Sequence, residues 1–377
     1  MPTEFEDVLS TDLTEIASRL CSAGKGILAS DESPSTMGKR LVKAGKENTP
    51  ETRRQYRGLF YGAELGGAIS GAILHPEALD MKLDDGRSFV EALHSQGIMV
   101  GVKVDEGLEP MEASCGAYEG ETSTKGLETL EERLATYHEK GARFAKWRAA
   151  MPICKDEYRI SRAAIEKNAA QLAAYAELCI AHGILPIVEP EILIDGDHDG
   201  GVYFVETRKV LGECMHALVQ RGVRLDHILL KCQMVTPGVD WKGNGPGRDP
   251  ATIARWTLDA LRQTVPPAVK GIMFLSGGQT EYQSTVNLNE LNVTARAFDE
   301  FAVPYRLSFS FGRGLQASVL DMWSRGESKE ACMKKAEEVA RVNGLAARGA
   351  FNEAVDGAHP TVLPKAGNLQ ETFRGVY

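Results

Sequence analysis

Short apolar runs recur along this chain at a regular distance, and segments with helical periodicity separate them. The centres of the runs lie near positions 28, 71, 101, 145, 188, 230, 274 and 309. A spacing of about 30–45 residues is typical of a strand followed by a helix. Eight such units in one chain predict a (β/α)8 TIM barrel, preceded by an N-terminal helix at about residues 10–23.

The main alternative fold is a doubly wound open sheet, which carries a glycine-rich turn after its first strand. Here the first run, residues 26–30, is followed by Asp31-Glu-Ser-Pro34 instead, and Pro34 predicts a loop. The barrel is therefore preferred, as a single domain over residues 1–357. Residues 358–377 contain two prolines and two glycines without periodicity, which predicts a mobile tail.

Composition limits the partners and the compartment. The net charge of −9 argues against nucleic acid or an anionic membrane surface as the main partner. Seven scattered cysteines without a Cys-x-x-Cys pair predict reduced thiols. The acidic N-terminus has no features of a signal or transit peptide, and no stretch is long and apolar enough for a membrane span. We expect a cytoplasmic protein, and a processed plastid form stays open.

Polar side chains lie at or near the ends of the predicted strands. In a barrel the carboxyl ends of all strands meet at one mouth, where active sites are built. Charges at so many strand ends predict a shared polar site, because a barrel interior is otherwise packed with aliphatic side chains. The residues placed at this mouth are Asp31, Lys103, Lys146, Arg148, Glu189, Glu191, Lys231, Ser276 and Arg313.

Lys231 is the most informative of these residues, because it follows the apolar run 228–230 in a strand predicted to end near Met234. A buried ammonium ion is costly, so the lysine must find a carboxylate, reach water or lose its proton. A free amine there could form a Schiff base with a ketone. Lys146 would add a second cation, which favours the uncharged amine, and Glu189 could shuttle protons. The alternative is a Lys–Glu–Lys ion network that only holds the mouth together.

Two glycine-rich turns indicate a phosphate site. Ser276-Gly277-Gly278 follows the seventh strand and Gly312-Arg313-Gly314 the eighth, where barrels frequently bind phosphate. Lys39, Arg40 and Lys103 could serve a second phosphate, or they could belong to a solvated helix face.

No metal or cofactor is predicted. The eight histidines lack the spacing of a ligand set. The segment Asp197-His198-Asp199 is interpreted as a solvated loop.

Seven motifs then occur in a fixed order, and together they resemble class I (Schiff-base) fructose-1,6-bisphosphate aldolases almost end to end. They are Gly-Ile-Leu-Ala-Ser-Asp31-Glu-Ser, Gly-Val-Lys103-Val-Asp, Phe-Ala-Lys146-Trp-Arg148, Pro-Ile-Val-Glu189-Pro-Glu191-Ile-Leu, Leu-Leu-Lys231 with Met-Val-Thr-Pro-Gly, Phe-Leu-Ser276-Gly-Gly-Gln and Ser-Phe-Gly312-Arg313-Gly-Leu-Gln-Ala-Ser.

The resemblance implies reversible cleavage of fructose 1,6-bisphosphate to dihydroxyacetone phosphate and glyceraldehyde 3-phosphate, a step of glycolysis and gluconeogenesis, with the Calvin cycle as a further setting. Lys231 would be the nucleophile, Glu189 the acid and base of imine formation, and Lys146 an assisting group that contacts substrate. Asp31 would take the proton of the C4 hydroxyl. The iminium serves as electron sink, so no metal is needed.

The same resemblance implies the binding groups and the assembly. One phosphate would lie against Ser276, Gly277, Gly312 and Arg313. Arg40 and Lys103 would help at the other end, and Arg148 is a further substrate-binding residue. The terminal Tyr377 would fold into the mouth and assist proton exchange on the enamine, and the protein would be a homotetramer.

This chain also departs from the family. Cys232-Gln233 stands where Pro-Asn is usual, Pro34 stands where threonine is common, and the residues before Tyr377 differ. Two other functions stay open: a different Schiff-base barrel enzyme such as a transaldolase-like one, and a non-catalytic interaction protein on the same scaffold.

Overall fold

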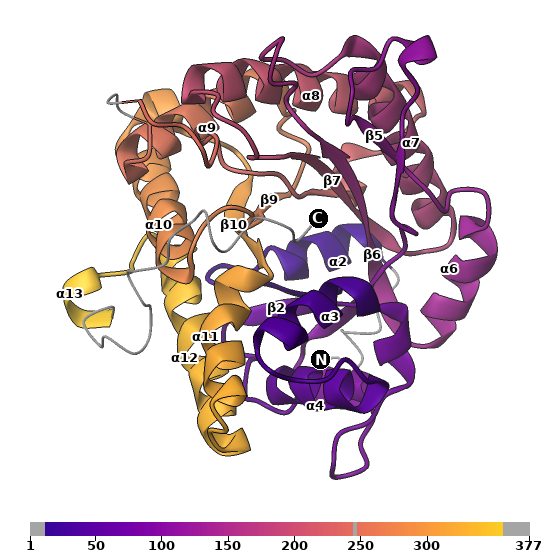
Figure 1. Ribbon diagram of the computed structural model, residues 1–377, viewed down its shortest axis with the longest axis vertical. Coiled ribbons are helices and arrows are strands. Elements are labelled where there is room, and N and C mark those ends of the chain that lie inside the picture. The colour runs from indigo at the N-terminus through magenta and orange to yellow at the C-terminus, as the bar shows by residue number, and fades with distance from the viewer. Residues whose placement is uncertain (1–11, 244–246, 357–377) are drawn as a thin grey trace.

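The computed structural model describes residues 12–243 and 247–356 (Figure 1). Eight parallel strands close into a barrel in the neighbour order β1-β10-β9-β8-β7-β6-β3-β2, which confirms the predicted fold. The barrel strands are β1 Gly26–Ser30, β2 Ile69–Leu74, β3 Met99–Lys103, β6 Ala142–Met151, β7 Leu185–Ile192, β8 Leu229–Leu230, β9 Gly271–Phe274 and β10 Arg306–Phe311. A separate antiparallel hairpin pairs β4 Leu108–Pro110 with β5 Thr122–Thr124.

Helices connect successive strands and surround the barrel (Figure 1). The α-helices are α2 Leu13–Leu20, α3 Pro34–Lys43, α4 Pro50–Tyr61, α5 Phe89–His94, α6 Leu130–Glu139, α7 Arg162–Ala181, α8 Gly200–Gln220, α9 Pro250–Thr264, α10 Glu281–Ala297, α11 Arg313–Ser324, α12 Lys329–Ala346 and α13 Glu353–Asp356. Short 3-10 turns are η1 Pro76–Asp80, η2 Ala113–Cys115, η3 Leu225–His227 and η4 Asp299–Phe301. None of the helices within the described ranges is long and apolar enough to cross a lipid bilayer.

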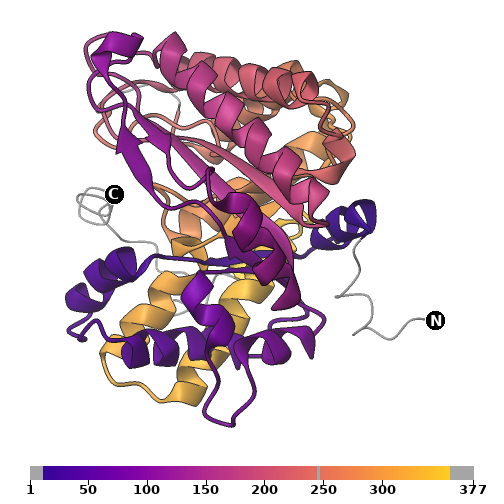
Figure 2. The same ribbon diagram turned by 90° about the vertical axis from the view of Figure 1, so that its right-hand side faces the viewer.

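The barrel interior is filled by one apolar cluster, which α2 closes at the amino end of the strands. Leu13, Ile16 and Leu20 of α2 pack on this cluster, and Figure 2 shows the helix, in indigo, at one end of the barrel. A larger cluster fills the layer between the strands and the outer helices. The strand residues of the inner cluster are Ile27, Ala29, Ile73, Met99, Phe144, Leu185, Ile187, Leu229 and Met273.

Phe144 occupies the middle of the barrel because two glycines leave room for its ring. A Cβ on Gly101 would lie 2.1 Å from the ring, and one on Gly71 would lie 3.1 Å from it. Such contacts are far inside the packing distance of carbon atoms, so neither position tolerates a side chain without movement of Phe144.

Two predicted elements near the mouth are corrected. Pro34 does not mark a loop: it is the first residue of α3, where its fixed φ is compatible with a helix and Ser33 caps the first turn. The sixth strand ends at Leu230 rather than near Met234, although the Cys232 carbonyl still accepts a 3.0 Å hydrogen bond from the Leu275 amide. The carbonyl of Val188 still accepts a 2.8 Å hydrogen bond from the amide of Lys231, so this residue stays fixed to β7.

Helix α10 was not predicted individually from the sequence. Helix α10 buries polar side chains such as Ser284, Thr285 and Asn287, so its apolar stripe is weak. Its capping box, Thr280 with Gln283, is the local signal that could have identified it.

Candidate active site

Strand geometry explains why the predicted polar residues converge. Successive side chains of a strand point to opposite faces, so residues two positions apart share a face. Lys146, Glu189 and Lys231 each lie two residues beyond an inward-facing apolar residue, which is Phe144, Ile187 and Leu229 respectively. The charged groups therefore continue the interior of the barrel above its apolar filling.

These groups line one cavity of about 310 Å³ at the carboxyl ends of the strands. The predicted catalytic and substrate-binding residues within the described part of the chain line it, whereas Lys39, a candidate for the second phosphate, is exposed on α3 and is not part of the wall. Tyr377 and the tail lie outside the described residues. The predicted residues at the cavity wall are Asp31, Arg40, Lys103, Lys146, Arg148, Glu189, Lys231, Ser276, Gly277, Gly312 and Arg313.

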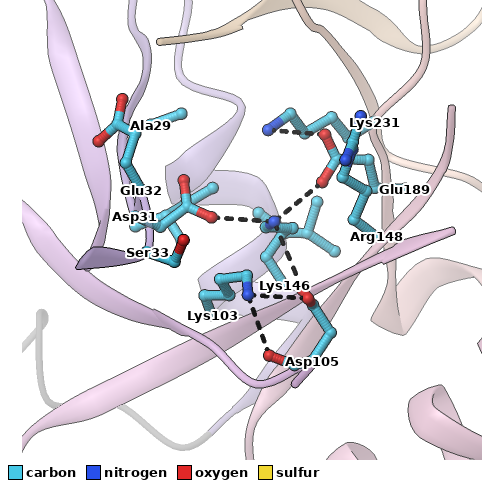
Figure 3. A network of polar contacts seen from close by, with 12 residues as sticks. Ala29, Asp31, Glu32, Ser33, Lys103, Asp105, Lys146, Arg148, Glu189 and Lys231 are labelled. Carbon is cyan, nitrogen blue, oxygen red and sulfur yellow. Dashed lines mark hydrogen bonds and ion pairs between the residues drawn. The ribbon is translucent and has the colours of Figure 1, made fainter. Parts of the chain in front are cut away.

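Lys146 is at the centre of an ion network (Figure 3). Its Nζ lies 2.9 Å from Asp31 Oδ2, 3.2 Å from Glu189 Oε2 and 3.7 Å from Asp105 Oδ2. The lysine is 3% exposed, so three carboxylates from β3, β7 and the end of β1 compensate one buried cation.

Glu189 joins this cation to Lys231. Its second oxygen, Oε1, lies 3.0 Å from Lys231 Nζ, and both side chains are buried (Figure 3). The lysine has therefore found a carboxylate, the first of the three outcomes that burial allows. The same contact places a proton acceptor directly against the amine, as proton shuttling requires.

The protonation of the network follows from burial and its charges. Burial alone would raise the pKa of Asp31, but the nearby ammonium groups of Lys146 and Lys231 lower it below its ordinary value. Burial would lower the pKa of Lys146, yet Asp31, Glu189 and Asp105 raise it. The pKa of Asp105 is lowered against the effect of burial by Lys146 and Lys103. Asp31 and Asp105 are thus carboxylates, and Lys146 is a cation, at neutral pH.

Basic groups lie around the network, and acidic neighbours orient them. Lys103 Nζ lies 2.8 Å from Asp105 Oδ1. Arg148 is paired with Glu191, and Arg40 Nη1 lies 2.5 Å from Glu32 Oε1. Each side chain thus has a defined direction at the cavity wall before a substrate enters.

The predicted phosphate turns are held together by hydrogen bonds. The Gly314 amide donates to Ser276 Oγ at 3.1 Å, which links the turn after β9 to the start of α11. Gly312 precedes α11 and Arg313 is its first residue, so the expected turn is the beginning of a helix. A helix start offers free backbone N–H groups to an anion.

Sequence reasoning missed three residues of the site. Asp105 bridges Lys103 and Lys146, and Glu32 holds Arg40. Gln233 donates from Nε2 to the Gly277 carbonyl at 2.5 Å and so supports the turn after β9. The signal for Asp105 was its position two residues after Lys103, and Gln233 stands two residues after Lys231, on the same face in an extended chain.

Cys232 has a different environment from its neighbours. It packs in the layer between barrel and helices, and burial raises the pKa of its thiol to about 12. Such a thiol carries almost no thiolate at neutral pH, which makes it a poor redox sensor.

Within residues 12–243 and 247–356, no group of three or more His, Cys, Asp and Glu side chains is arranged to bind a metal ion. The interpretation of residues 197–199 as a solvated loop is wrong for His198. This side chain is 2% exposed and stacks on Tyr203, and Asp199 caps α8.

Comparison with known proteins gives a consistent result. The family model "Fructose-bisphosphate aldolase class-I" matches residues 12–362. The non-muscle-type fructose-bisphosphate aldolase of Lethenteron camtschaticum is 46% identical over 343 residues, covering 90% of each chain. Human fructose-bisphosphate aldolase C is 45% identical over 347 residues, again with 90% of each chain.

A solved structure agrees with these relatives. The fructose-bisphosphate aldolase of Plasmodium falciparum, in complex with TRAP and a small-molecule inhibitor, superposes with a TM-score of 0.83 at 42% identity. The alignment covers 92% of this chain and 96% of that one. Fold and site thus define a (β/α)8 enzyme with buried lysines at its mouth. The chain belongs to the class I fructose-bisphosphate aldolase family.

Proposed function

We propose that this protein cleaves fructose 1,6-bisphosphate reversibly to dihydroxyacetone phosphate and glyceraldehyde 3-phosphate through a Schiff base on Lys231. The observation that carries the proposal is the buried Lys231 Nζ, 3.0 Å from Glu189 and in the wall of a cavity that Arg40, Lys103 and Arg313 also line. An amine, a proton carrier and two anion sites are the groups that a bisphosphorylated ketose requires.

Imine formation uses Lys231 and Glu189. The ammonium transfers a proton to Glu189, and the free amine attacks the C2 carbonyl to give a carbinolamine. Glu189 then returns a proton to the departing hydroxyl, so water leaves and a protonated imine remains. Lys146 stays cationic and stabilises negative charge that develops on oxygen during these steps.

Carbon–carbon cleavage uses Asp31. As a carboxylate it accepts the proton of the C4 hydroxyl, and the C3–C4 electron pair moves into the iminium to form an enamine. The C4 fragment leaves as the aldehyde. Asp31 lies 2.9 Å from Lys146, which orients its carboxylate toward the cavity shared with Lys231.

The two ends of the substrate have separate basic groups. Arg313, with Ser276, Gly277 and Gly312, would hold one phosphate, and Arg40 with Lys103 the other. Arg148 also lines the cavity and would contact the substrate.

Three predictions go beyond the described residues and stay proposals: the barrel domain extends over 1–357, the tail 358–377 reaches the mouth, and Tyr377 assists proton exchange on the enamine. Deletion of Tyr377 should then slow proton exchange more than imine formation, and equal effects on both steps would contradict its role.

We also propose a homotetramer in the cytoplasm. Light scattering should give four times the 41.0 kDa chain mass, and a stable monomer would contradict the assembly. Fractionation of the source cells should recover the protein with cytoplasmic rather than plastid markers.

A cleavage assay tests the proposed reaction. Wild-type protein should cleave fructose 1,6-bisphosphate equally well with and without EDTA, and loss of activity in chelator would contradict a metal-free mechanism. Arg313→Ala and Lys103→Ala should each raise KM for the bisphosphate. Unchanged KM values would favour a transaldolase-like enzyme, and complete inactivity of the wild type would favour a non-catalytic protein.

A further inference from the structure

A second cavity lies at the opposite end of the barrel from the mouth. Its volume is about 250 Å³, and segments 21–24, 292–308 and 347–348 form its wall. The positions along β10 show that the two cavities lie at opposite ends of the barrel. Arg306 at the start of this strand lines the second cavity, and Gly312, just beyond its end, lines the cavity at the mouth. We refer to this second space as the basal cavity.

Arg296, Arg306 and Arg348 line the basal cavity, and two of them donate hydrogen bonds to backbone carbonyls. Arg348 Nη2 donates to the Ala23 carbonyl at 3.1 Å, and Arg296 Nε donates to the Asn292 carbonyl at 3.0 Å. Within residues 12–243 and 247–356, Arg296, Arg306 and Arg348 form no ion pair with a carboxylate. This contrasts with the mouth, where Lys103, Lys146, Arg148 and Arg40 are each paired.

Two glycines make room for these guanidinium groups. A Cβ on Gly24 would lie 1.9 Å from Arg348 Nε, and one on Gly349 would lie 2.0 Å from Arg296 Nη2. Both glycines have positive φ, 75° and 56°, a region that other residues rarely adopt. The backbone is thus shaped to hold two cationic groups beside the cavity.

The remaining wall carries both apolar and polar groups. Ala295, Val303, Leu307 and Ala347 supply aliphatic surface, the buried Cys21 adds a thiol, and Ser22, Asn292, Tyr305 and Ser308 add polar groups. Burial raises the pKa of this thiol to about 12, and the charges that oppose the shift are the cations Arg306 and Lys270. The cavity therefore combines three arginines with a patch of aliphatic side chains, although the protein as a whole has a net charge of −9.

We propose that the basal cavity binds a small organic phosphate. The planar guanidinium groups would hold the phosphate oxygens, since arginine matches their geometry with paired N–H donors. The organic part would lie against the aliphatic wall around Val303 and Leu307. The site is separate from the mouth, so the inference does not depend on the proposed cleavage reaction.

Calorimetric titration of the full chain with phenyl phosphate, and with inorganic phosphate at the same ionic strength, tests this site. Four proteins are compared: wild type, the mouth variant Arg313→Gln, and this mouth variant carrying in addition either the basal pair Arg306→Gln/Arg348→Gln or the control pair Arg162→Gln/Arg325→Gln. The control removes the same charge from two exposed arginines of other surfaces. Arg306→Gln alone serves if the double variant does not fold.

We expect phenyl phosphate to bind the mouth variant Arg313→Gln, and addition of the basal pair to reduce that affinity by about tenfold or more. Addition of the control pair should change the affinity of the mouth variant by less than about twofold. Phenyl phosphate should bind the mouth variant more tightly than inorganic phosphate. An unchanged affinity after addition of the basal pair, an equal loss with the control pair, or disappearance of all binding in Arg313→Gln would overturn the proposal. Equal affinity for both probes would overturn the role of the apolar wall.

Discussion

The two ends of this barrel present cations in different ways. At the mouth, buried lysines are surrounded by carboxylates, and Lys146 alone lies within 4 Å of Asp31, Glu189 and Asp105. At the amino end, the three arginines of the basal cavity are exposed, and Arg296 and Arg348 donate to backbone carbonyls. Burial explains the difference, because an ammonium ion removed from water needs compensating charge and an exposed guanidinium does not.

This comparison separates two uses of positive charge. The mouth is a compensated network in which protons can move between neighbouring groups, as covalent chemistry requires. The basal cavity offers uncompensated charge, which is suited to binding an anion without chemistry. Variants at the mouth should therefore affect rate, and those at the basal cavity should affect only binding.

Lys231→Met should have the largest effect, because it removes the amine on which the covalent step depends. We expect kcat/KM for fructose 1,6-bisphosphate to fall by about 10⁴-fold or more in steady-state assays. Lys335→Met is the control, since Lys335 is also buried but lies on α12, away from the mouth. If the Lys231 variant kept near wild-type activity, the Schiff-base role would be contradicted, and the ion network would only stabilise the mouth.

Asp105→Asn tests whether activity and stability depend on the carboxylate of Asp105, which compensates the charges of Lys103 and Lys146. Asp105 lies between Lys103 and Lys146, so its neutralisation leaves two cations with less compensation. We expect kcat/KM to fall by about 10–100-fold and the melting temperature to drop. Asp80→Asn removes the partner of Lys140 from an exposed pair and should change neither quantity. Equal behaviour of the two variants would contradict the importance of burial.

Glu281 extends the comparison to a carboxyl group that has no ammonium group within 4 Å among residues 12–243 and 247–356. Its Oε1 accepts hydrogen bonds from the amide and hydroxyl of Ser318 at 2.9 and 3.1 Å, and burial raises its pKa to about 7. The folded state then binds a proton more strongly than the unfolded state, whose pKa is near 4.5. Stability should fall as pH rises from about 4.5 to about 7 and stay reduced above that range.

Glu281→Gln should remove this pH dependence and stabilise the protein by about 1–3 kcal/mol at pH 8 relative to wild type. Urea unfolding at pH 5 and pH 8 measures the effect. Glu166→Gln on the exposed surface of α7 is the control and should leave the pH dependence as in wild type. An unchanged slope in Glu281→Gln would show that this carboxyl does not titrate in that range.

Gln233→Ala should have the smallest effect. It removes the donor that holds the Gly277 carbonyl at 2.5 Å, so the turn after β9 loses a support without losing a charge. We expect KM for the bisphosphate to rise by about 3–10-fold, with kcat little changed. Cys232→Ala, next to it but on the outer side of the barrel, should leave KM unchanged. A larger rise in KM for Cys232→Ala than for Gln233→Ala would contradict the conclusion that Gln233 supports the substrate-binding turn and Cys232 does not.

Much of the site was predictable because the carboxyl ends of barrel strands meet at one mouth. The positions of Lys146, Glu189 and Lys231 at or near predicted strand ends indicated a shared site. Asp105 and Gln233 lie beyond the strand ends, and only their spacing of two residues from Lys103 and Lys231 indicates that they share a face with these lysines. The start of α11 at Arg313 was mistaken for a turn, since glycine-rich segments signal both turns and helix ends.

Covalent trapping tests the central claim most directly. Protein incubated with dihydroxyacetone phosphate and reduced with borohydride should gain one ligand mass per chain, and peptide mapping should locate it on Lys231. Attachment to Lys146 or Lys103, or no attachment in a protein that still cleaves fructose 1,6-bisphosphate, would contradict the account.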